Sequence, residues 1–176
     1  MALWVVLGIK ILLVLFLGYL CVSLAVVVLS GAPYIPSASS DLTAMLELLG
    51  PAAGRRVVDL GSGDGRVVIA LARAGFVSEG VEIIPLLVWR SRWKIVRAGL
   101  GSKAKIFQKN LWSCDFSAYD IVIVYGLPHL MDKFEAKLRS ELKPGALILA
   151  NKFQLPDWEP AAQKGDVSLY VQEASL

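Results

Sequence analysis

Hydrophobic and polar positions divide the chain into two parts with different patterns. Residues 11–29 contain no charged side chain, and Lys10 is the only charged residue before Asp41. Beyond Asp41, short apolar runs alternate with stretches in which apolar positions recur every three or four residues. The first part predicts one long apolar helix, and the second predicts strands that alternate with helices.

The uncharged run is long enough to cross a bilayer. It contains 19 residues, and at about 1.5 Å per residue such a helix nearly spans the hydrocarbon core. We therefore expect a single transmembrane helix within residues 1–30. A cleaved signal peptide and a buried core helix are the alternatives. The run is longer than a usual signal-peptide apolar segment of about 7 to 15 residues, and so short a chain has little else to surround a core helix.

The alternating pattern predicts one compact α/β domain over residues 41–176, preceded by a linker segment over residues 31–40. Strands alternating with helices indicate a mostly parallel, doubly wound, Rossmann-like sheet with right-handed crossovers. The expected strands are 56–60, 78–83, 104–109, 121–125, 146–153 and 167–171, and the expected helices are 41–49, 64–74, 85–99 and 130–142.

Charge and cysteine content exclude several classes of function. The part beyond residue 40 contains 17 of the 18 basic residues and all 15 acidic residues, a mild balance that does not indicate a nucleic-acid partner. The cysteines, Cys21 and Cys114, fall in the apolar helix and the domain, so no disulfide between them is expected. With one histidine and no cysteine pair, the chain offers no metal-binding constellation.

A glycine-rich turn carries the strongest chemical signal. Asp59 ends the first predicted strand, and glycine follows at every second position, at Gly61, Gly63 and Gly65, before a helix begins. Such a turn directs backbone N–H groups and a helix N-terminus at a bound ligand. Glu82 follows Gly65 by 17 positions, about one helix and one strand, so it emerges at the tip of the neighbouring strand. A carboxylate there can accept ribose hydroxyls.

This pattern resembles motif I and the next acidic position of class I methyltransferases, which bind S-adenosylmethionine. The resemblance implies that Gly61 and Gly63 line the cofactor, that Asp59 orients the loop and the methionyl amine, and that Glu82 binds the ribose. A dinucleotide-binding oxidoreductase is the main competitor, but it needs a third glycine where Arg66 stands. A glycine turn in an unrelated α/β domain is the remaining alternative.

Other polar or small residues also follow predicted strands. Asn110 comes after the third strand and Gly126 after the fourth, so both fall at the sheet edge where doubly wound folds bind ligands. The side-chain oxygen of Asn110 can accept the adenine amino group. An ordinary loop asparagine that caps a turn is the alternative.

Much of the domain resembles a narrower family, the membrane-associated protein-lysine methyltransferases that include the mitochondrial enzymes acting on the ATP synthase c-subunit and on adenine nucleotide translocase, with prokaryotic relatives. The resemblance implies a lysine of a membrane protein as acceptor and a single-pass location in a prokaryotic or mitochondrial membrane. It brings Ser37 near the cofactor carboxylate, a solvated linker serine being the alternative, and Asn110 stands where the family usually has aspartate. The segments concerned are 33–37, 59–68, 80–85, 87–92, 110–112, 124–131 and 153–158.

Lysine methylation requires a neutral amine, which an apolar aromatic pocket favours by desolvation. Tyr125 and Trp158, with Pro128, Phe153 and Pro156, follow the fourth and fifth strands and could form that pocket; a core role is the alternative for Phe153 and Trp158. His129 is a candidate general base, with a surface or capping histidine favoured instead. The prediction is a membrane-anchored S-adenosylmethionine-dependent protein-lysine methyltransferase. A methyltransferase for a lipid or quinone-like molecule and a non-catalytic cofactor-binding protein remain alternatives.

Overall fold

The computed structural model describes residues 2–30 and 39–173, and the chain separates into two compact units, Met1–Pro33 and Tyr34–Leu176. Ser37, one of the predicted cofactor-binding residues, lies outside the described residues.

The first unit consists of one helix, α1 (Ala2–Ser30). Its segment Trp4–Val22 is long and apolar enough to cross a membrane by length and composition, with a mean hydropathy of 2.7. The large apolar side chains described along this segment are exposed, with Trp4 at 75% and Leu12 at 68%. The predicted long apolar helix is therefore present, and its insertion into a membrane stays a prediction.

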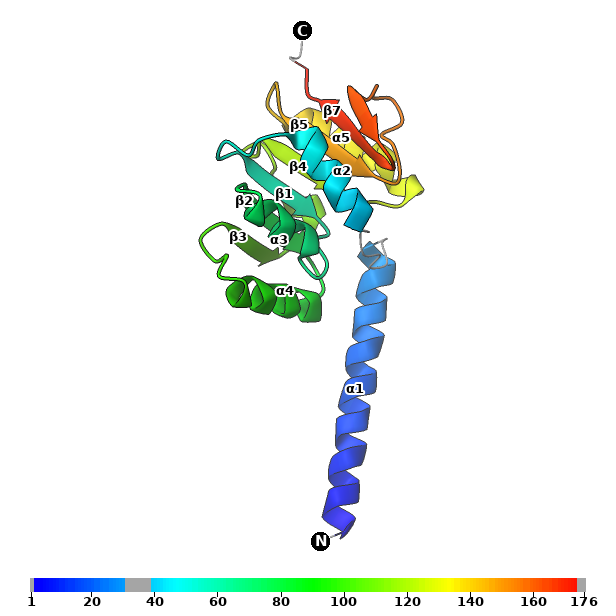
Figure 1. The fold of residues 1–176 in the computed structure, drawn as a ribbon. Helices are drawn as coiled ribbons and strands as arrows, with labels where there is room; N and C mark the ends of the chain where they lie inside the picture. The colour runs from blue at the N-terminus through cyan, green and yellow to red at the C-terminus, as the bar shows by residue number, and fades with distance from the viewer. Residues whose placement is uncertain (1, 31–38, 174–176) are drawn as a thin grey trace. The chain divides into compact units, whose positions relative to one another are not determined.

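The second unit is built on a seven-stranded sheet with the order β3-β2-β1-β4-β5-β7-β6 (Figure 1). The first five strands in this order are parallel, and β7 runs antiparallel to both β5 and β6. The sheet order reverses between β1 and β4, which is where doubly wound folds open a ligand-binding crevice. The strands are β1 (Arg56–Leu60), β2 (Val77–Glu82), β3 (Ala104–Gln108), β4 (Ile121–Val124), β5 (Leu147–Asn151), β6 (Ala162–Lys164) and β7 (Val167–Val171).

Helices cover both faces of the sheet. Because side chains alternate along a strand, Ile121 and Ile123 of β4 pack on one side and Val122 and Val124 on the other. The helix before β1, the helix between β1 and β2 and the helix after β2 cover the first side. The helix after β4 covers the second side. The helices are α2 (Ser39–Leu49), α3 (Arg66–Arg73), α4 (Pro85–Arg97) and α5 (Met131–Glu141), with 3₁₀ turns η1 (Leu111–Ser113) and η2 (Pro128–Leu130).

The predicted Rossmann-like architecture is confirmed, and the differences are local. Each expected strand and helix is present, with ends shifted by a few residues. The sequence analysis missed β6, whose three residues are all exposed, because a short exposed edge strand has no alternating apolar pattern to reveal it.

Candidate functional site: the glycine turn at the carboxyl edge of the sheet

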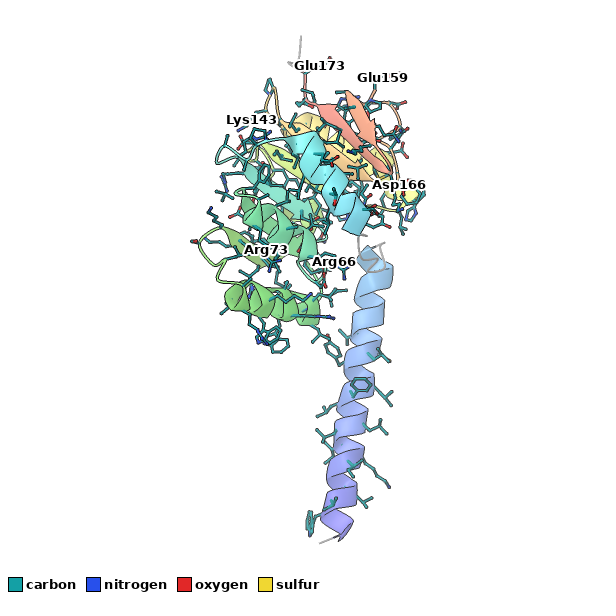
Figure 2. The ribbon with its side chains drawn as sticks, in the orientation of Figure 1. Arg66, Arg73, Lys143, Glu159, Asp166 and Glu173 are labelled. Carbon is teal, nitrogen blue, oxygen red and sulfur yellow. The ribbon has the colours of Figure 1, made fainter. Side chains whose placement is uncertain are left out.

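The glycine turn connects the end of β1 to the start of α3. Its backbone is fixed to the neighbouring strand, because the N–H groups of Gly61 and Ser62 both donate to the Val81 carbonyl, at 2.9 and 3.0 Å. Figure 2 shows Arg66, at the start of α3, and Asp166, just before β7, below Lys143 and Glu173 in the view. Since β7 is antiparallel to β5, Arg66 and Asp166 mark the carboxyl edge of the parallel strands.

Two glycines of the turn are required for different reasons. Gly61 has φ +80°, and a Cβ built there meets no atom within 4 Å, so the space above it is open. Gly65 has φ +76°, and a Cβ there would lie 2.6 Å from the Cβ of Ser91 on α4. Gly61 therefore leaves room for a ligand against the backbone, while Gly65 allows the close packing of α4.

The predicted ribose-binding acid, Glu82, faces the turn. It is buried, with 7% of its surface exposed. Its Oε2 accepts from the Gly63 N–H at 2.9 Å, and its Oε1 accepts from the N–H groups of Ile83 and Ile84 at 2.7 and 2.8 Å. These bonds occupy three of the roughly four lone-pair positions of a carboxylate. One ribose hydroxyl can be added directly, whereas two require one of these three bonds to be released.

Asp59 is a buried carboxyl group without a hydrogen-bond partner among the residues that the structure describes. Burial, together with the nearby carboxylates of Glu82 and Asp64, raises its pKa from 3.8 to about 7. An acid in this state favours a cationic ligand, because a positive charge nearby stabilises the ionised form. The predicted contact of Asp59 with a methionyl amine is consistent with this environment and stays a prediction.

Asp64, in the same turn, has a different environment. Burial alone would raise its pKa, but hydrogen bonds from Arg66 and Lys94 outweigh that effect and hold the pKa below its ordinary value. Its Oδ1 lies 3.0 Å from Arg66 Nε and its Oδ2 lies 2.6 Å from Lys94 Nζ. Asp64 thus ties α4 to the glycine turn. The sequence analysis gave it no role, because its partner Lys94 is 30 positions away.

Asn110 lies at the same edge, two residues after the end of β3, and is exposed. Its side-chain oxygen accepts from the Trp112 N–H at 3.0 Å and begins the turn η1. This is the capping role that the sequence analysis left open as the alternative. A contact with adenine stays a prediction.

The candidate acceptor-side residues after β4 are arranged along the same edge. Tyr125 follows β4 directly and is half-buried, whereas His129 is exposed on η2. Gly126 between them is buried, and a Cβ there would lie 2.7 Å from the Phe134 ring on α5. The chain after β4 therefore packs closely on α5 at Gly126.

Trp158 has the contacts of a core residue. It is 8% exposed, its ring lies 6.0 Å from that of Tyr170, and the Arg139 guanidinium lies 4.1 Å from its centre. For Trp158 these contacts match the core alternative, and contact with a substrate lysine stays a prediction. Phe153 is instead 37% exposed, so the core alternative does not describe it.

A buried polar pair at the end of β5 was not foreseen. Asn151 is fully buried, and its Nδ2 donates to Asp41 Oδ2 on α2 at 3.1 Å. The side-chain oxygen of Asn151 has no hydrogen-bond partner in the described part of the chain. The following residue, Lys152, has a left-handed backbone with φ +71°. Asn151 follows the pattern of a polar residue at a strand end, which could have identified it from sequence.

Comparison with known proteins agrees with this geometry. A family model described as the ANTKMT methyltransferase domain matches residues 59–162. The ATP synthase c-subunit lysine N-methyltransferase of Rattus norvegicus is 40% identical over 134 residues, which cover 76% of this chain and 62% of that protein. A protein-lysine N-methyltransferase of Saccharolobus islandicus (strain REY15A) is 31% identical over 130 residues, covering 73% of this chain and 81% of that protein.

Solved structures share the fold. A crystal structure of an RNA methyltransferase from Salinibacter ruber in complex with S-adenosyl-L-homocysteine has a TM-score of 0.77 and 29% identity, and the match covers 81% of this chain and 96% of that chain. This chain spans a little over half the length of the mammalian lysine methyltransferases that it matches. The family model and the lysine methyltransferase relatives agree with the fold and the glycine turn: the chain belongs to the family of the ANTKMT methyltransferase domain.

Proposed function

We propose that this chain is an S-adenosylmethionine-dependent protein-lysine N-methyltransferase. The observation that carries the proposal is the Glu82 carboxylate at the tip of β2, directed at the glycine turn with Oε2 2.9 Å from the Gly63 nitrogen. Membership of the methyltransferase family and the lysine methyltransferases among the relatives support it.

The residues at the turn fit S-adenosylmethionine. The open side of Gly61 gives the backbone access to a ligand, Glu82 retains an acceptor position for a ribose hydroxyl, and buried Asp59 suits a cationic neighbour. In this proposal Ser37 contacts the carboxylate of the cofactor and Asn110 contacts its adenine, and these two contacts complete the cofactor site. When bound, the cofactor supplies an electrophilic methyl group on a sulfonium.

The protein's part in the reaction is to deliver a neutral amine. A free lysine has a pKa of about 10.4, so only about one amine in 2,500 is neutral at pH 7, which costs about 4.6 kcal/mol. Desolvation of the acceptor lysine beside Tyr125 lowers that cost. With the cofactor bound, its methyl group would be the electrophile for this amine, and the methylated amine would then lose a proton. His129, exposed on η2, is a candidate to receive that proton.

We further propose that the acceptor lysine belongs to a membrane protein. Helix α1 has the length and composition of a membrane span. An enzyme anchored in the bilayer meets a substrate of the same bilayer at a raised effective concentration. The ATP synthase c-subunit, named in the description of a 40% identical relative, is an acceptor to try first.

The test is methyl transfer to native membranes. Membranes are incubated with the full chain and cofactor labelled at the methyl group, and label is measured separately in protein, lipid extract and RNA. The expected result is label on lysine side chains of membrane proteins, located by mass spectrometry. Label confined to lipid or to RNA would contradict the lysine acceptor, and cofactor binding without transfer would favour the non-catalytic alternative.

A matched pair of variants links the activity to the site. Glu82→Gln keeps the shape of the side chain but removes its charge, and we expect loss of lysine label. Glu79 lies on the same strand and pairs with Arg56 at 3.2 Å, on the far side of β2 from the turn. Glu79→Gln is therefore the control and should keep its activity. Equal activities of the two variants would exclude Glu82 from the site.

A further inference from the structure

Helix α4 presents an apolar stripe to its surroundings. Leu86, Trp89, Trp93 and Val96 are 53%, 66%, 49% and 74% exposed. Their spacing of three and four residues places them on one face of the helix. In the described part of the second unit, Phe153 and Val171 are the other large hydrophobic residues counted as exposed.

The fold does not require this stripe. Helix α4 packs on the domain through its opposite face, where Val88, Ser91 and Ile95 are buried. Figure 1 shows α4 at the outside of the α/β domain, beside β2 and β3. Exposed tryptophans that contribute nothing to the core indicate a surface with an external partner.

The surroundings of the stripe are basic. Helix α4 contains Arg90, Arg92, Lys94 and Arg97 and has no acidic residue. Two of these side chains interact within the domain: Arg92 donates to the Ile106 carbonyl, and Lys94 forms an ion pair with Asp64. Arg90 and Arg97 are exposed, and the Arg97 guanidinium lies 4.7 Å from the centre of the Trp93 ring.

The neighbouring edge strand extends the basic surface. Lys109, directly after β3, is exposed, and α4 and β3 are in contact. Ala104 and Ile106 of β3 pack with α4, so the exposed Lys105 between them points to the other face of the sheet and is not part of this surface. The partner of this surface is therefore anionic and has an apolar layer next to its charges.

We propose that the outer face of α4 binds the surface of an anionic lipid bilayer. The bilayer interface satisfies both features of the face, because tryptophans lie at the headgroup level and basic side chains of an amphipathic helix contact the phosphates. Trp89 and Trp93 enter the interface, and Arg90 and Arg97 bind lipid phosphates. Exposed Leu86 and Val96 favour lipid over RNA, since aliphatic side chains offer no stacking surface to bases. The proposal is independent of methyl transfer.

The test measures contact between α4 and lipid in the full chain. Cys21 and Cys114 are changed to serine, Val96→Cys carries a fluorescent label, and the protein is reconstituted in vesicles that contain lipids brominated near the headgroup. The vesicles are phosphatidylcholine alone or equal parts of phosphatidylcholine and phosphatidylglycerol. We expect strong quenching with phosphatidylglycerol and weak quenching without it. The control is the same label at Val171→Cys. Val171 is exposed on β7, which lies towards the opposite edge of the sheet from β3, so this label should remain unquenched.

A charge reversal provides the matched comparison. Arg90→Glu should lower the ratio of docked to undocked label at least about fivefold, since one basic side chain near an anionic surface contributes about that factor. Arg73→Glu makes the same change of charge at an exposed position on α3 and should leave the ratio unchanged. Circular dichroism confirms that both variants are folded.

Several results would overturn the proposal. These are equal quenching of the labels at Val96 and Val171, quenching that does not depend on phosphatidylglycerol, or equal effects of the two charge reversals. Single-stranded RNA that changes the Val96 label more than vesicles do would assign the face to nucleic acid. Label-to-label contact without lipid would assign it to a second copy of the chain.

Discussion

Individual residues at the turn divide into those that serve the fold and those available to a ligand. Asp64 has two cationic partners and is neutralised within the protein. Asp59, five positions earlier, is buried and has none among the described residues. A buried carboxyl group without a partner lowers stability when it ionises, so Asp59 is a residue whose environment favours binding over stability.

Asp59→Asn should stabilise the protein without cofactor and weaken cofactor binding. The folded-state pKa of about 7 lies above the ordinary value of 3.8, so the folded wild type binds the extra proton and loses stability as pH rises from about 4 to about 7. Above that range the penalty reaches about 4 kcal/mol. The difference in melting temperature between wild type and variant should grow across this pH window and stay constant above it. A constant difference from pH 4 to pH 8 would contradict the assignment.

The same raised pKa predicts that cofactor binding depends on pH. A cationic ligand favours ionised Asp59, so affinity for S-adenosylmethionine should increase as pH rises through about 7, and binding should release protons. Calorimetry in buffers of different ionisation enthalpy measures that release. Asp59→Asn should abolish it, while S-adenosylhomocysteine, which keeps the methionyl amine that Asp59 is predicted to contact, should still show it.

Alanine at two glycines of the turn should separate binding from stability. Gly61→Ala places a Cβ in open space at φ +80°, so it costs about 1 to 2 kcal/mol of strain and obstructs the ligand. Gly65→Ala adds a clash with Ser91 at 2.6 Å and should cost about 1 to 3 kcal/mol more. Titration of both variants with S-adenosylmethionine measures the affinity, and thermal melting measures the stability. Ser91→Gly should recover part of the stability of Gly65→Ala and none of the affinity of Gly61→Ala.

At the scale of elements, α4 is attached to the turn by the close packing of Gly65 on Ser91 and by one ion pair. Lys94 reaches Asp64 from the middle of α4, and the Asp64 side chain is only 4% exposed. Glu82, Ile83 and Ile84 then connect β2 to the same turn through hydrogen bonds. The ligand-binding loop is thus fixed from two neighbouring elements.

Lys94→Met should lower the free energy of unfolding by about 2 kcal/mol at pH 7, because it leaves a buried carboxylate with only one cationic partner. The depressed pKa of Asp64 means that this contribution is present above its ordinary value of 3.8 and disappears as pH falls below it. Denaturant unfolding at pH 7 and at a pH below 3.8 checks that the difference in stability between wild type and variant is present at the first pH and smaller at the second. Lys105→Met, at an exposed position of β3, is the control and should change little.

Element-level structure was largely predictable, and the exceptions have a physical cause. β4 is a run of four apolar residues that is buried on both faces, and the proline and glycine at the ends of α4 mark its limits. β6, η1 and η2 are each three residues long and contain no buried residue, so no periodic pattern distinguishes them from loops.

For the whole molecule, the main question is how the apolar helix and the α/β domain act together. The sequence indicates a bilayer for α1 and a methyl-transfer site for the domain. The outer face of α4 adds a second proposed contact with the same bilayer. The insertion of α1, the methyl transfer and the lipid contact of α4 can each be tested independently of the other two.

A charge in the middle of α1 tests whether the helix spans a membrane. Leu15→Arg should disfavour insertion by about 3 kcal/mol, whereas Leu15→Ala should have a small effect. The measurement is the fraction of the full chain that resists alkaline extraction from membranes. Identical fractions for the two variants would show that α1 is not inserted.

Local pattern in the sequence was enough to establish the order of elements, the apolar helix, the glycine turn and the position of Glu82 at the tip of β2. These features depend on periodicity and on short spacings. Packing in three dimensions was needed to establish that Asn151 meets Asp41 across 110 positions, that Lys94 neutralises Asp64 and that Trp158 packs in the core. It was also needed to show that Asp59 has no cationic partner within residues 2–30 and 39–173. Such outcomes depend on burial and on which elements pack together, and the chain's local pattern does not encode either one directly.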